Sequence, residues 1–433
     1  MSDERPILVH YGPSETSISQ VSSLDTPTLR VPRVRASQPS VTKSASTVSW
    51  RDVRKQAFIA WIWTRLLLIA FTFATAFYEY TRGHHASLSS AAGLLELWYR
   101  FDTSAYLHMV YYGYATLYQA AFFPLYPLMI YLLTRVFGMG AALLIGLIIS
   151  NLGTLVAFIG LVRLVVDEGG DLKASRFALL ALAAYPMAFF LGAAYTEGPF
   201  IAAAVWCLWS MRRGRWYIAA GCALFAALVR PTGMILFAPL LYEFARQHDW
   251  GRRWRGAILQ ACAVTLAGPV GVGAYSLYCA VHYHDPLAWI HSESKAWGRV
   301  SMPIWQALHD TLTYIVSLRP LSAAQDKKLV DYFAILFVVV MTVALARRQP
   351  LSFTLYLAGL LYLTLDSPFV VSASHHYAVY LSASRYMLPS IPVFIGLGRW
   401  GARAPALAWA CAIAAFAVQA VFAIYFLHGG WVA

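Results

Sequence analysis

The chain has 433 residues, of which 59% are hydrophobic and only 12% charged, and its formal net charge is +13. Soluble domains typically contain about 45–50% apolar and 25% charged residues, so this composition excludes an ordinary soluble protein. The positive charge does not indicate nucleic-acid binding, because the basic residues form short clusters between apolar runs and do not gather in one domain. The sequence therefore predicts a polytopic helical membrane protein of the all-α class.

The first 50 residues differ in composition from the rest of the chain. They are rich in Ser, Thr and Pro, show no apolar periodicity and carry Arg and Lys near their C-terminal end. This composition is typical of disordered segments, so residues 1–50 are predicted to be a disordered cytoplasmic tail and residues 51–433 the transmembrane domain. We expect the apolar run 57–78 to serve as an uncleaved signal anchor, because the tail shows no signal-peptide pattern.

Apolar runs of membrane-spanning length follow one another along the remaining chain. The run 57–78 would form a helix roughly 33 Å long, enough to cross the hydrocarbon core. Placing every basic cluster in the cytoplasm gives about eleven crossings and a cytoplasmic N-terminus. The predicted crossings are 57–78, 139–163, 175–195, 198–211, 216–229, 232–246, 256–281, 332–346, 351–366, 379–398 and 404–427.

Two long connections fall on the external side in this arrangement, residues 79–138 and 282–331. The apolar segment 124–138 is too short to cross the bilayer, and counting it as a crossing would invert every later loop. We expect it to dip into the outer leaflet instead. The first external loop is thus predicted to carry interfacial helices, with Asp102 at the lipid–water interface.

A small set of ionisable residues shares this external side. Charged residues at membrane depth are costly, so each is a functional hypothesis. Asp102 and Arg100 lie in "WYRFDTSAYLHMVYYGY", Glu197 in "AYTEGPF", Arg230 in "VRPTG", Asp285 in "HYHDPLAWIHSESKAWGR" and Arg385 in "SASRYMLPSIP".

Each of these residues also has a structural interpretation, which composition alone leaves open. The aromatic residues around Asp102 are typical of an interfacial belt, and Asp102 itself suits an exposed loop carboxylate or a partner of Arg100. Glu197 suits the positive end of a following helix. Arg230 and Arg385 suit side chains that extend to lipid headgroups.

The sequence does not indicate a resident metal or a disulfide. His282, His284 and Asp285 resemble part of a metal cluster, but a fourth ligand is not placed. The five cysteines contain no C-x-x-C pair and lie within or beside apolar runs, as packing residues do.

The order of the motifs adds a resemblance to a known family. "WYRFDTSAYLHMVYYGY" followed by "AAFFPLYPLMIYLL" resembles the GPI mannosyltransferase II family (PIG-V type) and its bacterial relatives, which carry W-x-x-D-x-x-x-Y-x-x-I-A-x-x-G-Y and then A-F-F-P-x-x-P. Trp98 stands one residue further upstream than in that pattern, and His108 and Met109 stand where a more apolar pair is expected. The later pieces "AYPMAFFLGAAYTEGPF", "ALVRPTG", "DPLAWIHSESKAWGR" and "SRYMLPSIPVF" follow in the family's order, so the resemblance covers about residues 57 to 400.

The resemblance implies a GT-C type glycosyltransferase fold and the transfer of a hexose, typically mannose, from a polyprenyl or dolichyl phosphate carrier. It implies that Asp102 is the catalytic aspartate of the first external loop, and that Glu197 orients a hydroxyl or holds a divalent cation. Arg385 is the first choice for the leaving phosphate and Arg230 the second. The residues expected to bind substrate are Trp98, Arg100, Tyr106, His108, Arg230, Asp285, Arg385 and Tyr386.

The acceptor stays open, because only the eukaryotic branch of the resemblance implies a GPI precursor. The membrane would be the plasma membrane in a bacterium and the endoplasmic reticulum in a eukaryote, with the active site on the external or luminal face. A transporter or flippase of lipid-linked sugars is the alternative, since it would also have buried arginines and broken helices. An enzyme requires its polar groups to converge in a pocket open to one side, whereas a transporter requires a midplane site.

Overall fold

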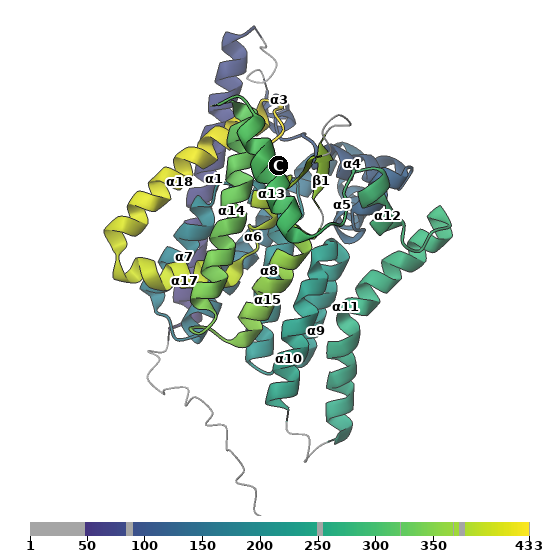
Figure 1. Ribbon diagram of the computed structural model, residues 1–433, viewed down its shortest axis with the longest axis vertical. Helices are drawn as coiled ribbons and strands as arrows, with labels where there is room; N and C mark the ends of the chain where they lie inside the picture. Colours follow the sequence, from purple (N-terminus) through teal and green to yellow (C-terminus); the bar gives the residue numbers. More distant parts are fainter. Residues whose placement is uncertain are drawn as a thin grey trace, which may run out of the picture. The chain divides into compact units, whose positions relative to one another are not determined.

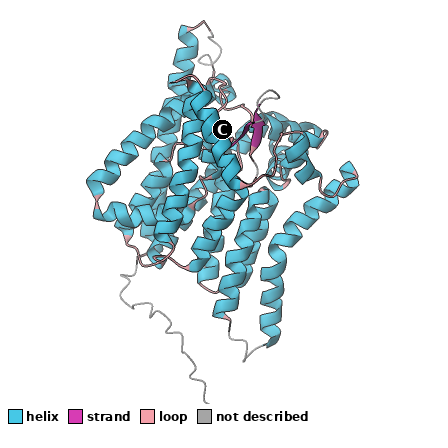
Figure 2. Cartoon of the chain, in the orientation of Figure 1, coloured by secondary structure: helices cyan, strands magenta, loops and turns pink. Residues whose placement is uncertain are grey.

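The computed structural model describes residues 48–83, 90–248, 254–320, 322–366, 368–371 and 377–432. Nearly all of the predicted tail, residues 1–47, lies outside the described residues. The described chain is helical apart from one short two-stranded hairpin (Figure 1, Figure 2). The all-α prediction is therefore confirmed with this one exception.

Five helices in the described part of the chain are long and apolar enough to cross a membrane, so the protein is membrane-embedded. Each overlaps a predicted crossing. They lie in α1 (Trp50–Thr81), in η2 and α6 (Met139–Ala141 and Ala142–Asp167), in α11 (Trp254–Tyr283), in α14 (Ala323–Leu345) and in α18 (Pro405–Leu427).

The outer face of α1 illustrates why these helices need a bilayer. Ile59, Trp63, Leu66, Phe73 and Phe77 are exposed along it. Such a row of large apolar side chains would be an aggregation hazard in water. In a membrane the same row faces lipid, and burial by other helices is not required.

Shorter helices occupy the positions of the other predicted crossings. The longest of them, α8, has 16 residues and is about 24 Å long, less than the roughly 30 Å of a hydrocarbon core. Crossings by single helices are therefore not shown for these segments. The short helices are α7 (Leu172–Ala184), α8 (Glu197–Arg212), α9 (Trp216–Val229), α10 (Phe237–Gln247), α15 (Leu351–Leu365) and α17 (Ile391–Arg403).

The crossing predicted at 175–195 is wrong as a continuous helix. α7 ends because Tyr185 adopts an extended ψ of 133°, the conformation favoured ahead of a proline such as Pro186. The chain then forms the short 3₁₀ helix η3 (Ala188–Leu191) before α8 begins. Another 3₁₀ helix, η4 (Pro231–Leu236), separates α9 from α10.

The crossing predicted at 379–398 is also interrupted. It starts in strand β2 (Tyr377–Val379), passes through Ser382 in a left-handed conformation and continues through the short helix α16 (Ala383–Tyr386) before α17. Strand β1 (Phe369–Val371) pairs antiparallel with β2, with Val370 opposite Ala378. The break places Arg385 in a helix of four residues instead of in a long one.

α8 is the central helix of the bundle and is buried on nearly all faces, as an apolar helix without a polar side should be. It packs closely on α6 because two glycines meet there. A Cβ on Gly198 would lie 2.2 Å from the Ser150 carbonyl oxygen, and a Cβ on Gly153 would lie 2.6 Å from the Pro199 nitrogen. This close approach fixes the start of α8, where Glu197 stands.

Both long connections contain helices, as was predicted for the first of them. α4, α5, α12 and β1 gather at one end of the bundle, and the facing ends of α10 and α11 lie at the other (Figure 1). With 13 residues, α5 is too short to cross the bilayer. The elements are α3 (Ala91–Glu96), α4 (Asp102–Tyr112), η1 (Leu117–Ala121) and α5 (Leu125–Phe137) in the first connection, and α12 (Ala288–Lys295) and α13 (Ile304–Ser317) in the second.

Candidate active site

Asp102 is the first residue of α4 and follows an unusual backbone turn. Phe101, immediately before it, has φ 47° and ψ −115°, which non-glycine residues rarely adopt. The Phe101 ring packs against Phe426 and Trp431 with centroid distances of 5.7 and 5.5 Å, so packing holds the strained residue. Asp102 is buried, with 8% of its surface exposed. The expectation of an exposed, hydrated carboxylate is wrong.

Arg385 follows a second strained turn. Ser382, with φ 63°, immediately precedes α16, and it and Phe101 are two of the three described non-glycine residues with positive φ. Asp331 on α14 fixes this turn, because its Oδ1 accepts hydrogen bonds from Ser384 N and Oγ at 2.9 and 2.6 Å. Backbone strain that the surrounding structure maintains is typical of functional sites, and here it occurs beside both Asp102 and Arg385.

Arg385 joins two carboxylates from other elements. Its Nη2 donates to Asp102 Oδ2 at 2.7 Å, and its Nε lies 2.9 Å from Glu197 Oε1. The same Glu197 oxygen accepts from Arg230 Nη1 at 2.7 Å. Two carboxylates and two guanidiniums thus alternate in a buried chain, and removing any member would leave a charge without its partner.

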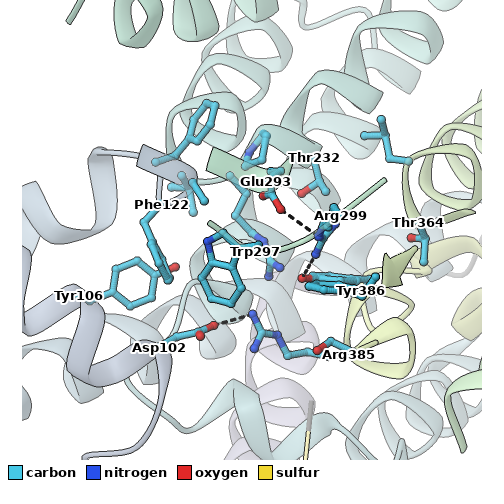
Figure 3. A pocket seen from close by; sticks show the side chains of 18 of the residues that line it. Asp102, Tyr106, Phe122, Thr232, Glu293, Trp297, Arg299, Thr364, Arg385 and Tyr386 are labelled. Carbon is cyan, nitrogen blue, oxygen red and sulfur yellow. Dashed lines mark hydrogen bonds and ion pairs between the residues drawn. The ribbon is translucent and has the colours of Figure 1, made fainter. Parts of the chain in front are cut away.

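A second ion pair stands on the other side of the same space (Figure 3). Arg299 Nε lies 2.9 Å from Glu293 Oε2, and Arg299 Nη2 donates to the Tyr386 hydroxyl at 2.6 Å. The guanidinium carbons of Arg230, Arg299 and Arg385 lie 5.9, 5.2 and 5.7 Å from the centroid of the Tyr386 ring. Three cations therefore surround one aromatic ring.

These groups line one open cavity. Its charged lining residues are Asp102, Arg230, Glu293, Arg299 and Arg385. The cavity can thus receive a molecule that carries both a negatively charged group and a hydroxyl.

Aromatic side chains form the opposite wall of the cavity (Figure 3). Tyr106 packs edge-on against Phe122 and Tyr126, with centroid distances of 5.1 and 4.8 Å. Trp297 stacks on Tyr118 at 4.4 Å with an interplanar angle of 19°. Flat apolar surfaces beside charged groups suit a ligand with a sugar ring or an apolar chain next to its polar head.

The pair formed by Glu293 and Arg299 has shifted pKa values. Burial raises the pKa of the Glu293 carboxyl, Arg299 opposes this, and the negative charge of Asp102 adds to it. For Arg299, burial acts to lower the pKa, but Tyr386 and Glu293 outweigh that effect and the pKa is raised. The guanidinium stays charged, while the carboxyl is the more easily neutralised partner.

Five of the residues selected from the sequence meet in this cavity. They are Asp102, Tyr106, Arg230, Arg385 and Tyr386. Arg230 and Arg385 are buried at the cavity wall, so the alternative of side chains extended to lipid headgroups is wrong.

Glu197 lies behind the cavity and does not line it. Its Oε1 contacts both Arg230 and Arg385, and its buried Oε2 has no hydrogen-bond partner among the described residues. Glu197 therefore positions two guanidiniums. The expectation that it orients a substrate hydroxyl directly is not supported by this placement.

The carboxylates of the site do not form an oxygen-rich cation site, because each faces an arginine. In the part of the chain that the structure describes, no three His, Cys, Asp or Glu side chains gather around a common point. The residues as placed do not fit the divalent cation considered from the sequence, and no step is assigned to one.

Trp98 and Arg100 lie outside the cavity although they flank Asp102 in sequence. Trp98 Nε1 donates to Thr72 Oγ1 at 3.1 Å within an apolar cluster. Arg100 Nε and Nη2 donate to the Leu427 carbonyl at 3.1 and 2.9 Å, where they cap the end of α18. The alternative that Arg100 pairs with Asp102 is wrong, because Arg385 takes that place.

His108 and Asp285 also point elsewhere. His108 Nδ1 contacts Gln119 Nε2 at 2.7 Å. Asp285 caps the chain before α12 by accepting from Leu287 N at 2.9 Å, and its second oxygen lies 2.5 Å from His291 Nδ1. These contacts assign both residues to local structure and not to the wall of the cavity.

Sequence reasoning missed Glu293, Trp297 and Arg299. All three lie in "DPLAWIHSESKAWGR", where Asp285 was selected instead. The available signal was a carboxylate and a guanidinium on either side of a tryptophan, within a seven-residue stretch of a connection that was predicted to be external. The bridge between Arg299 and Phe369 of β1, which brings this segment over the cavity, has no local signature.

Comparison of the chain with family models, with curated proteins and with solved structures found no match. The fold and the site therefore define the structural class of the protein and not its family. That class is a helical membrane-embedded protein with a cavity at one end of the bundle, lined by paired arginines, carboxylates and aromatic rings.

Proposed function

We propose that the protein is a membrane glycosyltransferase of the GT-C type. It transfers a hexose, with mannose as the first candidate, from a polyprenyl or dolichyl phosphate carrier to a hydroxyl of a glycolipid or another acceptor. The observation that carries the proposal is the convergence of Asp102 with three guanidiniums around Tyr386 in one cavity. The carrier has an anionic phosphate on its reacting carbon, so the reaction needs a base and cations side by side.

Asp102 is the proposed general base. As the acceptor hydroxyl oxygen bonds to the anomeric carbon, its proton passes to the Asp102 carboxylate. The bond between that carbon and the phosphate oxygen breaks, and its electron pair leaves with the carrier phosphate. This single displacement inverts the anomeric centre and needs no second carboxylate as nucleophile.

Arginines would stabilise the charge that the departing phosphate gains. The contacts favour Arg230 over Arg385 for this task, because Arg385 already faces two carboxylates and Arg230 faces one. Arg385 is then the residue that orients Asp102. Once Asp102 has taken up the proton, the charge of Arg385 is less compensated at the moment when the phosphate becomes a dianion.

A transporter of lipid-linked sugars remains the second candidate. It requires a site near the midplane that each side can reach. Because α4, α12 and β1 bring the cavity to one end of the bundle (Figure 1), the enzyme is the better supported of the two. The proposed orientation puts this end outside or in the lumen and the N-terminus in the cytoplasm.

Labelling of single cysteines tests the orientation. In a background without native cysteines, Ser294→Cys on α12 should react with an impermeant maleimide added from outside. Arg348→Cys, exposed after α14, should react only after permeabilisation, because basic loops face the cytoplasm. The reverse pattern would overturn the threading.

The function is tested with purified protein in lipid vesicles, polyprenyl phosphate mannose and a panel of hydroxyl acceptors. We expect donor consumption, release of polyprenyl phosphate and a mannosylated product with inverted anomeric configuration. Carrier lipids with other hexoses, offered in parallel, define the sugar. Movement of the intact carrier across the bilayer without consumption would reject the enzyme in favour of the transporter.

A further inference from the structure

The charged site is formally neutral before a ligand binds. It contains three guanidiniums, those of Arg230, Arg299 and Arg385, and three carboxylates, those of Asp102, Glu197 and Glu293. An anionic phosphate gains little from a neutral cluster, because each cation already has a partner. Binding therefore requires one carboxylate to release its guanidinium.

Glu293 is the carboxylate that separates most easily. Its side chain is 31% exposed, against 11% for Asp102 and 0% for Glu197. Glu197 contacts two guanidiniums, whereas the ion pair that the structure records for Glu293 is with Arg299. Glu293 also stands on α12, a helix of 8 residues in a connection, and not on the central helices.

The contact between Glu293 and Arg299 is incomplete as a hydrogen bond. The two atoms are 2.9 Å apart, yet the buried Nε–H of Arg299 makes no hydrogen bond to any described residue. Nη2 is used by the Tyr386 hydroxyl. A phosphate oxygen in the cavity would be a second acceptor for this guanidinium, beside the Tyr386 hydroxyl. The guanidinium would then donate hydrogen bonds at two points.

The titration of Glu293 agrees with such a release. Burial and the neighbouring charge of Asp102 raise the pKa of its carboxyl, and Arg299 is the group that opposes this shift. When Arg299 turns to another anion, Glu293 loses its stabilising partner and its neutral form is favoured.

We propose that Glu293 is a placeholder anion, which neutralises Arg299 in the empty cavity and yields it to the phosphate of a bound lipid phosphate. The inference rests on the proposed function for the identity of that lipid, a polyprenyl phosphate. Arg299 is thereby a phosphate-binding residue of the cavity, and it shares the Tyr386 ring with Arg230.

The test is binding of polyprenyl monophosphate to purified protein in nanodiscs of uncharged lipid. Glu293→Gln removes the competing charge and should tighten binding about 2- to 5-fold, the range of a partly exposed ion pair. Glu293→Ala should act in the same direction. Arg299→Gln should weaken binding about 10-fold or more. Asp310→Asn, a half-buried carboxylate on α13 outside the cavity, should leave binding unchanged.

The placeholder would be overturned if both Glu293 variants bound polyprenyl monophosphate no more tightly than the wild-type protein does. It would also be overturned if the variants bound the uncharged polyprenol more tightly by the same factor. Phosphatidic acid distinguishes the source of the phosphate. If the wild-type protein binds phosphatidic acid but not polyprenyl phosphate, and Glu293→Gln tightens that binding, the placeholder stands and the polyprenyl donor is rejected. If the wild-type protein binds and transfers from polyprenyl phosphate mannose while the Glu293 variants bind normally, only the placeholder fails.

Discussion

Replacing Asp102 by Asn is expected to lower the rate of sugar transfer by about 10²- to 10⁴-fold, the usual cost of losing a general base. The amide has the size of the carboxylate and can accept a hydrogen bond from Arg385, but it cannot take up the acceptor's proton. Binding of the carrier lipid should survive, because the substitution removes a negative charge from a cavity that receives a phosphate.

Asp102→Asn should also lower the free energy of unfolding. An exposed loop carboxylate, one of the alternatives that the sequence left open, would change the stability little. Asp102 is buried and accepts from Arg385 at 2.7 Å. The loss should stay below the about 3–5 kcal/mol typical of breaking a buried pair, because Asn keeps the acceptor and Arg385 keeps Glu197.

The measurement is transfer by folded Asp102→Asn protein, with carrier binding recorded on the same sample. Glu96→Gln is the matched control, since this exposed carboxylate lies six residues upstream and outside the cavity, and its transfer rate should be unchanged. Near-normal turnover by Asp102→Asn would remove Asp102 as the base and make a transporter the better interpretation.

The sequence predicted the long helices well because hydropathy depends on local composition alone. It failed where the chain breaks. The end of α7 at Tyr185 and the turn at Ser382 are set by single backbone conformations within otherwise apolar runs. A hydropathy pattern does not detect such turns. These turns nevertheless bring Glu197 and Arg385 toward Asp102.

Within the site, closeness in sequence was a poor guide to closeness in space. On a helix, residue i+4 shares a face with residue i and i+6 does not. Tyr106 accordingly lies beside Asp102 in the cavity, and His108 points away. Trp98 lies before the turn at Phe101, and its side chain therefore lies outside the cavity. The partner of Asp102, Arg385, is 283 residues distant, and only the tertiary fold reveals it.

Replacing Arg385 by Ala is expected to abolish measurable transfer and to destabilise the protein by about 3–5 kcal/mol, because two buried carboxylates lose a shared cation. Arg385→Lys should recover only part of both losses. An ammonium is a point charge and cannot reproduce the fork that contacts Asp102 and Glu197 from two nitrogens.

A double-mutant cycle between Asp102→Asn and Arg385→Ala separates the pair from its surroundings. With the Asp102 charge already removed, Arg385→Ala should cost less stability than in the wild-type protein, with a coupling of about 0.5–3 kcal/mol as found for contacting residues. The control cycle joins Asp102→Asn with Arg348→Ala, an exposed arginine outside the cavity, and its effects should add. Additive losses in the first cycle would mean that Asp102 and Arg385 do not pair in the membrane. Arg385 would then be free to serve the leaving phosphate, and its assignment as the residue that orients the base would be wrong.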